Sequence, residues 1–257
     1  MIRRRPLALV ACAGWLLATP AACAPPRAES PPRAPGAGAE AWFPLVDGAR
    51  WVYEVRAGFG KSRLEVTAQG TRDVKGAPAP LFIMQERSVG GPFGMQDDGL
   101  AGYLVQGGYL SRFSFLSRDP DGGIRLMGSE PSRVLPVEPR AGQGWSEQTH
   151  VFTTPESKGG EQNWKASLER VDSLRVPAGS FRDLLLVRTE YLDPSVSKGP
   201  LVTYEDYYAR GVGLVRSVSR NHQAYFWNDT LEQDLVEVHF GPPPVEPAPG
   251  GPAGKEW

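Results

Sequence analysis

Cysteine and histidine are scarce in this 257-residue chain. Its two cysteines, Cys12 and Cys23, both lie near the start, so the rest of the chain can form no disulfide bond and no cysteine-based metal or redox site. Three histidines are present, and no two of them lie within five positions of each other. The His-Glu-x-x-His pattern of zinc enzymes is therefore missing, and we expect no metal site.

An excess of positive charge is also missing. The chain has 28 lysines and arginines against 29 aspartates and glutamates, and its one basic run is Arg3–Arg5. Proteins whose main function is to bind nucleic acid need a basic surface that neutralises phosphates. We therefore expect no nucleic-acid partner.

Motifs that identify an enzyme are absent as well. The chain has no Gly-x-Ser-x-Gly element, and no glycine-rich segment follows a strand, opens a helix and carries Lys-Ser/Thr. The segment 119–123 lacks the ligands of a calcium loop, and Glu205 and Asp206 would face opposite sides of a strand. We expect no catalytic residue and no cofactor. One alternative stays open, a hydrolase whose Ser and Asp converge from afar on a histidine; the candidates are His150, His222 and His239.

The first 22 residues have the pattern of an export signal. A basic start at Arg3–Arg5 precedes an apolar stretch over residues 7–17, which is too short to span a bilayer as a helix. Residues 17–23 resemble the lipobox of bacterial lipoproteins, except that Pro20 stands where leucine is usual. We expect lipidation of Cys23 and attachment to a membrane through this lipid anchor. The alternative is simple cleavage near Ala22, which would release a soluble exported protein.

Two segments rich in proline and glycine flank the central region. Residues 23–41 and 241–257 contain almost no large apolar side chain, so they cannot bury enough surface to fold alone. We interpret the first as a tether behind the lipidated cysteine and the second as a disordered tail. The folded domain is then predicted over residues 42–240.

Hydrophobic residues in this domain recur with a period of two. In the segment 50–56, for example, Trp51, Tyr53 and Val55 alternate with charged residues, and glycine-rich turns separate many similar short segments. This pattern predicts an all-β fold, a curved antiparallel sheet of about ten to thirteen strands that forms a half-barrel or a barrel-like structure. The segment 162–175 is predicted as a strand, although it also fits one face of a helix.

Three segments resemble a known group of proteins. They are WFPLVDGARWVY at 42–53, VPAGSFRD at 176–183 and YYARGVGLV at 207–215. Together they resemble the TapB-type relatives of a domain family of unknown function, which are bacterial exported β-sheet lipoproteins. The resemblance implies a curved antiparallel sheet, distantly similar to the half-barrels of LolA and LolB. It implies no catalytic residue.

Aromatic residues remain as candidates for a binding site. On the concave face of a half-barrel they could line a cavity for a hydrophobic or lipid-like ligand, or they could simply fill it. The candidates are Trp51, Tyr53, Phe113, Phe115, Trp164, Tyr191, Tyr204 and Tyr208.

We therefore predict a non-enzymatic lipoprotein of the cell envelope that binds such a ligand. Ala24 follows Cys23 where an inner-membrane lipoprotein often has aspartate; in a Gram-negative cell this favours the outer membrane. The alternative is an adaptor that binds an envelope protein through a sheet edge or through the proline-rich tail.

Overall fold

The computed structural model describes residues 38–58, 60–90, 97–128, 131–154, 157–193, 198–222 and 230–241. The predicted signal peptide, the lipidation site at Cys23 and the predicted tail beyond residue 241 lie outside the described residues.

The described chain is almost entirely β-structure, with fifteen strands and one 3₁₀ helix, η1 (Gly38–Ala41). Twelve strands form one sheet in the order β10-β11-β12-β13-β14-β15-β1-β2-β4-β5-β6-β9. The strands of this sheet are β1 (Arg50–Ala57), β2 (Gly60–Arg72), β4 (Leu81–Val89), β5 (Asp97–Gln106), β6 (Tyr109–Phe113), β9 (Ser132–Pro136), β10 (Gly144–Thr154), β11 (Ser157–Val176), β12 (Gly179–Leu192), β13 (Val202–Ala209), β14 (Gly213–Asn221) and β15 (Thr230–His239).

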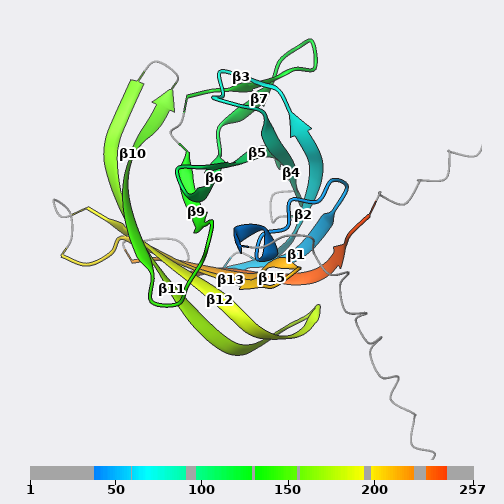
Figure 1. Ribbon diagram of the computed structural model, residues 1–257, viewed down its shortest axis with the longest axis vertical. Helices are drawn as coiled ribbons and strands as arrows, with labels where there is room; N and C mark the ends of the chain where they lie inside the picture. The colour runs from blue at the N-terminus through cyan, green and yellow to red at the C-terminus, as the bar shows by residue number, and fades with distance from the viewer. Residues whose placement is uncertain are drawn as a thin grey trace, which may run out of the picture.

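This sheet curls into a nearly closed barrel, as Figure 1 shows in a view into the barrel from one end. All its neighbouring strands pair antiparallel; β1 pairs with β2 on one side and with β15, the last strand, on the other. The predicted all-β, barrel-like fold is therefore confirmed. The segment 162–175, for which a helix was the alternative, lies within strand β11.

The two edge strands of the sheet, β9 and β10, meet at a seam that side chains bridge. The backbone N–H of Arg133 on β9 donates to the carboxylate of Glu147 on β10 at 3.0 Å. The Arg133 guanidinium donates to the carbonyl of Ser146 at 3.4 Å and also lies over the ring of Tyr109, 4.6 Å from its centroid. Arg133 therefore joins the two edges that a backbone ladder would join in a closed barrel.

Alternation along each strand decides which side chains face the interior. On β13, Tyr204, Asp206 and Tyr208 point inward. Glu205 points to the outer face, where it forms ion pairs with Arg188 at 3.3 Å and with Arg220 at 3.0 Å. One strand thus supplies both the interior and a charged outer surface.

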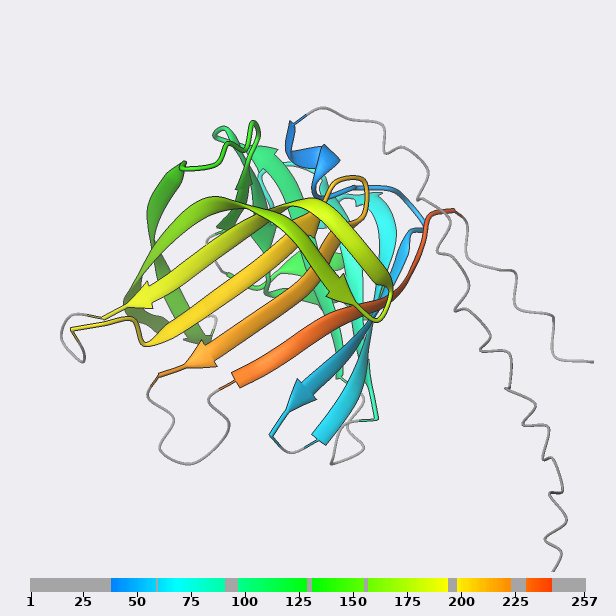
Figure 2. The ribbon, with the colours of Figure 1, turned by 90° about the horizontal axis from the view of Figure 1, so that it is seen from below.

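One end of the barrel is capped by η1, as Figures 1 and 2 show together, and Trp42 follows it directly in the sequence. The N–H of Ala39 donates to the carbonyl of Val137, and the carbonyl of Ala41 accepts from the N–H of Gly211. Trp42 is 2% exposed, and the guanidinium groups of Arg170 and Arg210 each lie 4.8 Å from its ring. The cap therefore ties together parts of the barrel that are distant in sequence, and the packed structure begins before Trp42.

A glycine permits this cap to approach the barrel. Gly38 has a φ of +76°, and a Cβ atom there would lie 2.2 Å from the carbonyl oxygen of Val137. An alanine could not keep this contact.

A second, smaller sheet covers part of the outer surface of the barrel. Its strands are β3 (Val74–Lys75), β8 (Ile124–Leu126) and β7 (Leu116–Arg118), and β3 and β8 run parallel. A separate hydrophobic cluster contains residues of this sheet and of β4 and β6: Val74, Leu81, Ile83, Phe113 and Ile124. These short strands bring the total above the predicted ten to thirteen.

Candidate ligand-binding site

The interior of the barrel contains a cavity of about 510 Å³. Every strand of the twelve-stranded sheet contributes at least one side chain or backbone segment to its lining. Cavities of this size are typical of small-molecule sites. The whole barrel therefore builds one site, rather than a single loop or hairpin.

Much of the lining is apolar and aromatic. Phe43, directly after the cap, reaches into the cavity, and its ring centroid lies 4.7 Å from that of Tyr103 and 6.2 Å from that of Tyr208. Trp164 lies on another wall, with its ring 6.1 Å from that of Tyr204. The aliphatic part of the lining comes from Leu64, Val66, Met84, Val134, Val187 and Leu214.

A charged pair interrupts this apolar surface. The Nη2 of Arg112 on β6 donates to Oε1 of Glu86 on β4 at 2.8 Å, across the intervening strand β5. Both side chains lie deep within the barrel but keep 38% and 31% of their surface exposed, because they face the cavity. Tyr103 and then Glu86 act to raise the pKa of Arg112 above its ordinary value, although desolvation opposes them. The guanidinium therefore stays charged inside the barrel.

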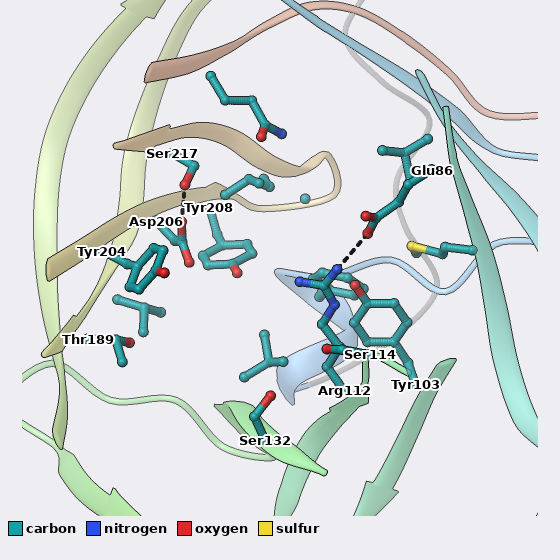
Figure 3. A pocket seen from close by; sticks show the side chains of 18 of the residues that line it. Glu86, Tyr103, Arg112, Ser114, Ser132, Thr189, Tyr204, Asp206, Tyr208 and Ser217 are labelled. Atoms are coloured by element: carbon teal, nitrogen blue, oxygen red, sulfur yellow. Dashed lines mark hydrogen bonds and ion pairs between the residues drawn. The ribbon is translucent and has the colours of Figure 1, made fainter. Parts of the chain in front are cut away.

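The opposite wall carries a second polar group. Ser217 on β14 donates to Oδ1 of Asp206 at 2.6 Å. Figure 3 shows Asp206, Tyr204 and Tyr208 on one side of the cavity, facing Glu86, Tyr103 and Arg112 on the other. Burial raises the pKa of Asp206 above its ordinary value, while Ser217 and Arg112 act to lower it. The carboxyl thus gains a proton more readily than an exposed aspartate does.

The tyrosines of the interior are kept neutral. Burial raises the pKa of Tyr103 to about 12, and burial also raises the pKa of Tyr53 and of Tyr208. The Tyr53 hydroxyl donates to the carbonyl of Leu214 at 3.1 Å. A neutral phenol can donate a hydrogen bond to a bound molecule.

The structure brings five of the eight aromatic candidates from the sequence to the cavity. These are Trp51, Tyr53, Trp164, Tyr204 and Tyr208.

The other three candidates lie elsewhere. Tyr191 pairs with Trp164 across β11 and β12, with ring centroids 5.1 Å apart, but does not line the cavity. Phe113 belongs to the cluster beneath the small sheet, because its neighbour Arg112 takes the inward position on β6. Phe115 lies beyond the end of β6 and is 50% exposed.

The polar part of the lining and the aromatic residues Phe43 and Tyr103 were not predicted from the sequence. One signal was present: Asp206 lies two residues from both Tyr204 and Tyr208, so it shares their face of a strand. A carboxylate on an aromatic face of a strand indicates a polar group inside a barrel.

Residues that could support other chemistry do not gather in the described part of the chain. Its His, Cys, Asp and Glu residues form no group of three or more that could hold a metal ion. His222 and His239 are exposed, with Thr203 and Glu237 as their respective partners, and the side chain of His150 lies outside the described residues. None of the described helices has the length and apolar character to cross a membrane.

Neither a family model nor a curated protein matches the sequence, so the resemblance to TapB-type proteins depends on the three segments alone. Similar solved structures include a candidate lipoprotein of Parabacteroides distasonis, with 15% identity, a TM-score of 0.47, and coverage of 77% of this chain and 97% of that one. A candidate exported protein with a YmcC-like fold, from Bacteroides fragilis, has 12% identity, a TM-score of 0.44, and coverage of 77% and 98%. A β-barrel-like protein of the family DUF1849 from Brucella abortus has 8% identity, a TM-score of 0.33, and coverage of 75% and 98%.

Proposed function

We propose that this protein is a non-enzymatic lipoprotein of the cell envelope that binds a hydrophobic or lipid-like ligand inside its barrel. The observation that carries the proposal is the cavity of about 510 Å³ within a sheet whose interior is otherwise well packed. A packed core leaves few voids larger than a water molecule, because each void loses dispersion contacts. A cavity of this size, lined by residues of every strand of the sheet and by aromatic side chains from β1, β5, β11 and β13, suits a ligand better than it suits a packed core.

The cellular location follows from the sequence. Arg3–Arg5 and the apolar stretch after them direct export, and Cys23 receives the lipid anchor. In a Gram-negative cell, the residue after it, Ala24, favours the outer membrane. The cap begins at Gly38, so a short segment joins the anchor to the capped end of the barrel. This arrangement holds the ligand site close to a membrane that supplies apolar molecules.

Native mass spectrometry of the full-length Cys23→Ser variant, purified from a bacterial host, tests the proposal. The substitution removes the cysteine that would be acylated, so a lipid that is lost on denaturation is not a covalently attached anchor. We expect an added mass that is lost on denaturation and a lipid in the organic extract. An unliganded mass that does not change when decanol or decanoate is added would contradict the proposal and favour an adaptor that binds an envelope protein.

A further inference from the structure

We propose that the ligand is an amphipathic acid, whose anionic head group binds Arg112 while its apolar part lies against the aromatic walls. The head group is an oxyanion, either a carboxylate or a phosphate. This inference rests on the proposed function, since it specifies the chemistry of the molecule in the same cavity.

The first argument concerns the hydrogen bonds that Arg112 leaves unused. A guanidinium has five N–H donors, and Glu86 accepts one hydrogen bond from Nη2. Within the described part of the chain, the buried Nε of Arg112 has no hydrogen-bond partner. Figure 3 shows the guanidinium between Glu86 and the wall that carries Tyr208 and Asp206. A planar guanidinium with donors to spare is the group that best recognises a carboxylate or a phosphate.

The second argument is that the carboxylates of the lining already have hydrogen-bond donors, whereas Arg112 has donors left over. Glu86 accepts from Arg112, Asp206 accepts from Ser217, and Glu147 accepts from the backbone N–H of Arg133. Each of these carboxylates therefore has a donor of its own. A cationic ligand would have to compete with those donors and would lie near Arg112, whose charge repels it.

The third argument is that neutral hydrogen-bond donors lie near Arg112 in the cavity. The hydroxyl groups of Tyr103 and Tyr208 come from β5 and β13, and both side chains line the cavity near Arg112. Because burial raises the pKa of each of them, they remain protonated. An anion placed here would therefore meet one charged donor and two neutral ones.

The size of the cavity sets the length of the apolar part. A volume of about 510 Å³ equals that of about 17 water molecules at ~30 Å³ each. A single-chain acid with about a dozen non-hydrogen atoms, such as decanoate, fits within this volume. A lipid with two long chains would exceed it.

Isothermal titration calorimetry of the full-length Cys23→Ser protein at pH 8 tests the proposal with three probes: decanoate, decyl phosphate and decanol. We expect at least one acid to bind about 10- to 100-fold more tightly than decanol, which is the range that one charge-assisted hydrogen bond supplies. If one acid binds much more tightly than the other, that acid identifies the head group. If decanol binds as tightly as both acids, the inference about the head group is wrong, although the cavity still binds apolar molecules. If none of the three binds, the proposed function itself fails.

Two substitutions locate the head group. Arg112→Met should remove the preference for the acid over decanol. Glu86→Gln removes the carboxylate that competes for Arg112, so it should raise the affinity for the acid several-fold. Because Glu86→Gln is expected to strengthen binding, a loss of folding cannot imitate its effect. Unchanged affinity for the acid in both variants would overturn the proposal.

Discussion

The guanidinium of Arg112 donates to the carboxylate of Glu86 inside the barrel, across the strand that lies between them. Burying an ion pair costs desolvation energy that the attraction between the charges often fails to repay. A protein that needed only a stable core would do better with apolar residues at both positions. Stability alone therefore does not explain this pair, which supports the proposal that the interior binds a polar group as well as an apolar one.

Asp206→Asn should change how stability depends on pH. Because the pKa of Asp206 is raised in the folded state, the folded protein binds more protons than the unfolded chain at pH values above the ordinary pKa of 3.8. The free energy of unfolding must therefore fall as the pH rises from about 3.8 through the raised pKa. Asparagine can still accept from Ser217 but has no proton to lose. The decrease of the unfolding free energy with rising pH that Asp206 causes should therefore be absent in the variant. At neutral pH it should gain about 1.4 kcal/mol for each pH unit by which the pKa is raised.

Urea denaturation between pH 4 and pH 8 measures this effect. Glu147, whose pKa burial also raises, is present in both proteins, so its contribution cancels in the difference. Glu205→Gln, at the adjacent outward position, serves as the control and should not gain stability, because it loses ion pairs with Arg188 and Arg220. Identical pH profiles for wild type and Asp206→Asn would refute the role given to Asp206.

Thr189→Trp should block the cavity. Thr189 lies on β12 with its side chain toward the interior, so an indole at this position would occupy space that the ligand needs. We expect the affinity for decanol and for decanoate to fall at least tenfold in a calorimetric titration. Arg188→Trp, one residue away on the outer face, should bind both probes as the wild type does. If the two variants bind alike, the binding site lies outside the barrel.

Trp42→Ala should destabilise the whole domain. The indole is buried at the capped end, with the guanidinium groups of Arg170 and Arg210 each 4.8 Å from its ring, and removal of a buried tryptophan costs about 3–5 kcal/mol. For a domain of this size, the midpoint temperature of thermal unfolding should fall by on the order of 10 °C. Phe115→Ala, at a site that is 50% exposed, should change the unfolding free energy by less than about 0.5 kcal/mol. A Trp42→Ala variant as stable as Phe115→Ala would show that the cap contributes little.

Arg133→Ala should loosen the seam between β9 and β10. The variant loses the hydrogen bond to Ser146 and the contact with Tyr109, which together should cost about 1–2 kcal/mol. Hydrogen exchange followed by mass spectrometry should show faster exchange in the β9 and β10 peptides and unchanged exchange in β13 and β14. Arg140→Ala breaks an exposed pair with Glu138 and serves as the control. An equal increase of hydrogen exchange in all strands would contradict the role of Arg133 in joining β9 to β10.

The fold class could be predicted from the sequence because alternation is a local property. Trp51, Tyr53 and Val55 show it within seven residues, and glycines mark the turns: Gly179, Gly211 and Gly213 all have positive φ. The small sheet could not be predicted, since β3 has two residues and β7 and β8 have three each. Segments of this length carry no readable period.

The candidate site was harder to predict, because it depends on which strands lie opposite each other. Arg112 and Glu86 are 26 positions apart in the chain, and Asp206 lies a further 94 residues beyond Arg112. Nothing local relates these positions. Phe113 was wrongly predicted to face the cavity. Its segment alternates as expected, but the side chain of Phe113 lies on the outer face of the sheet and that of Arg112 on the inner face.

A crystal structure of the full-length Cys23→Ser protein grown with decanoate would test the central claim most directly. We predict continuous density for the acyl chain inside the barrel, among Trp51, Trp164 and Phe43, with the carboxylate in contact with Arg112. Ordered water throughout the cavity, or decanoate bound only to the outer surface at a concentration that saturates the protein in solution, would contradict the claim.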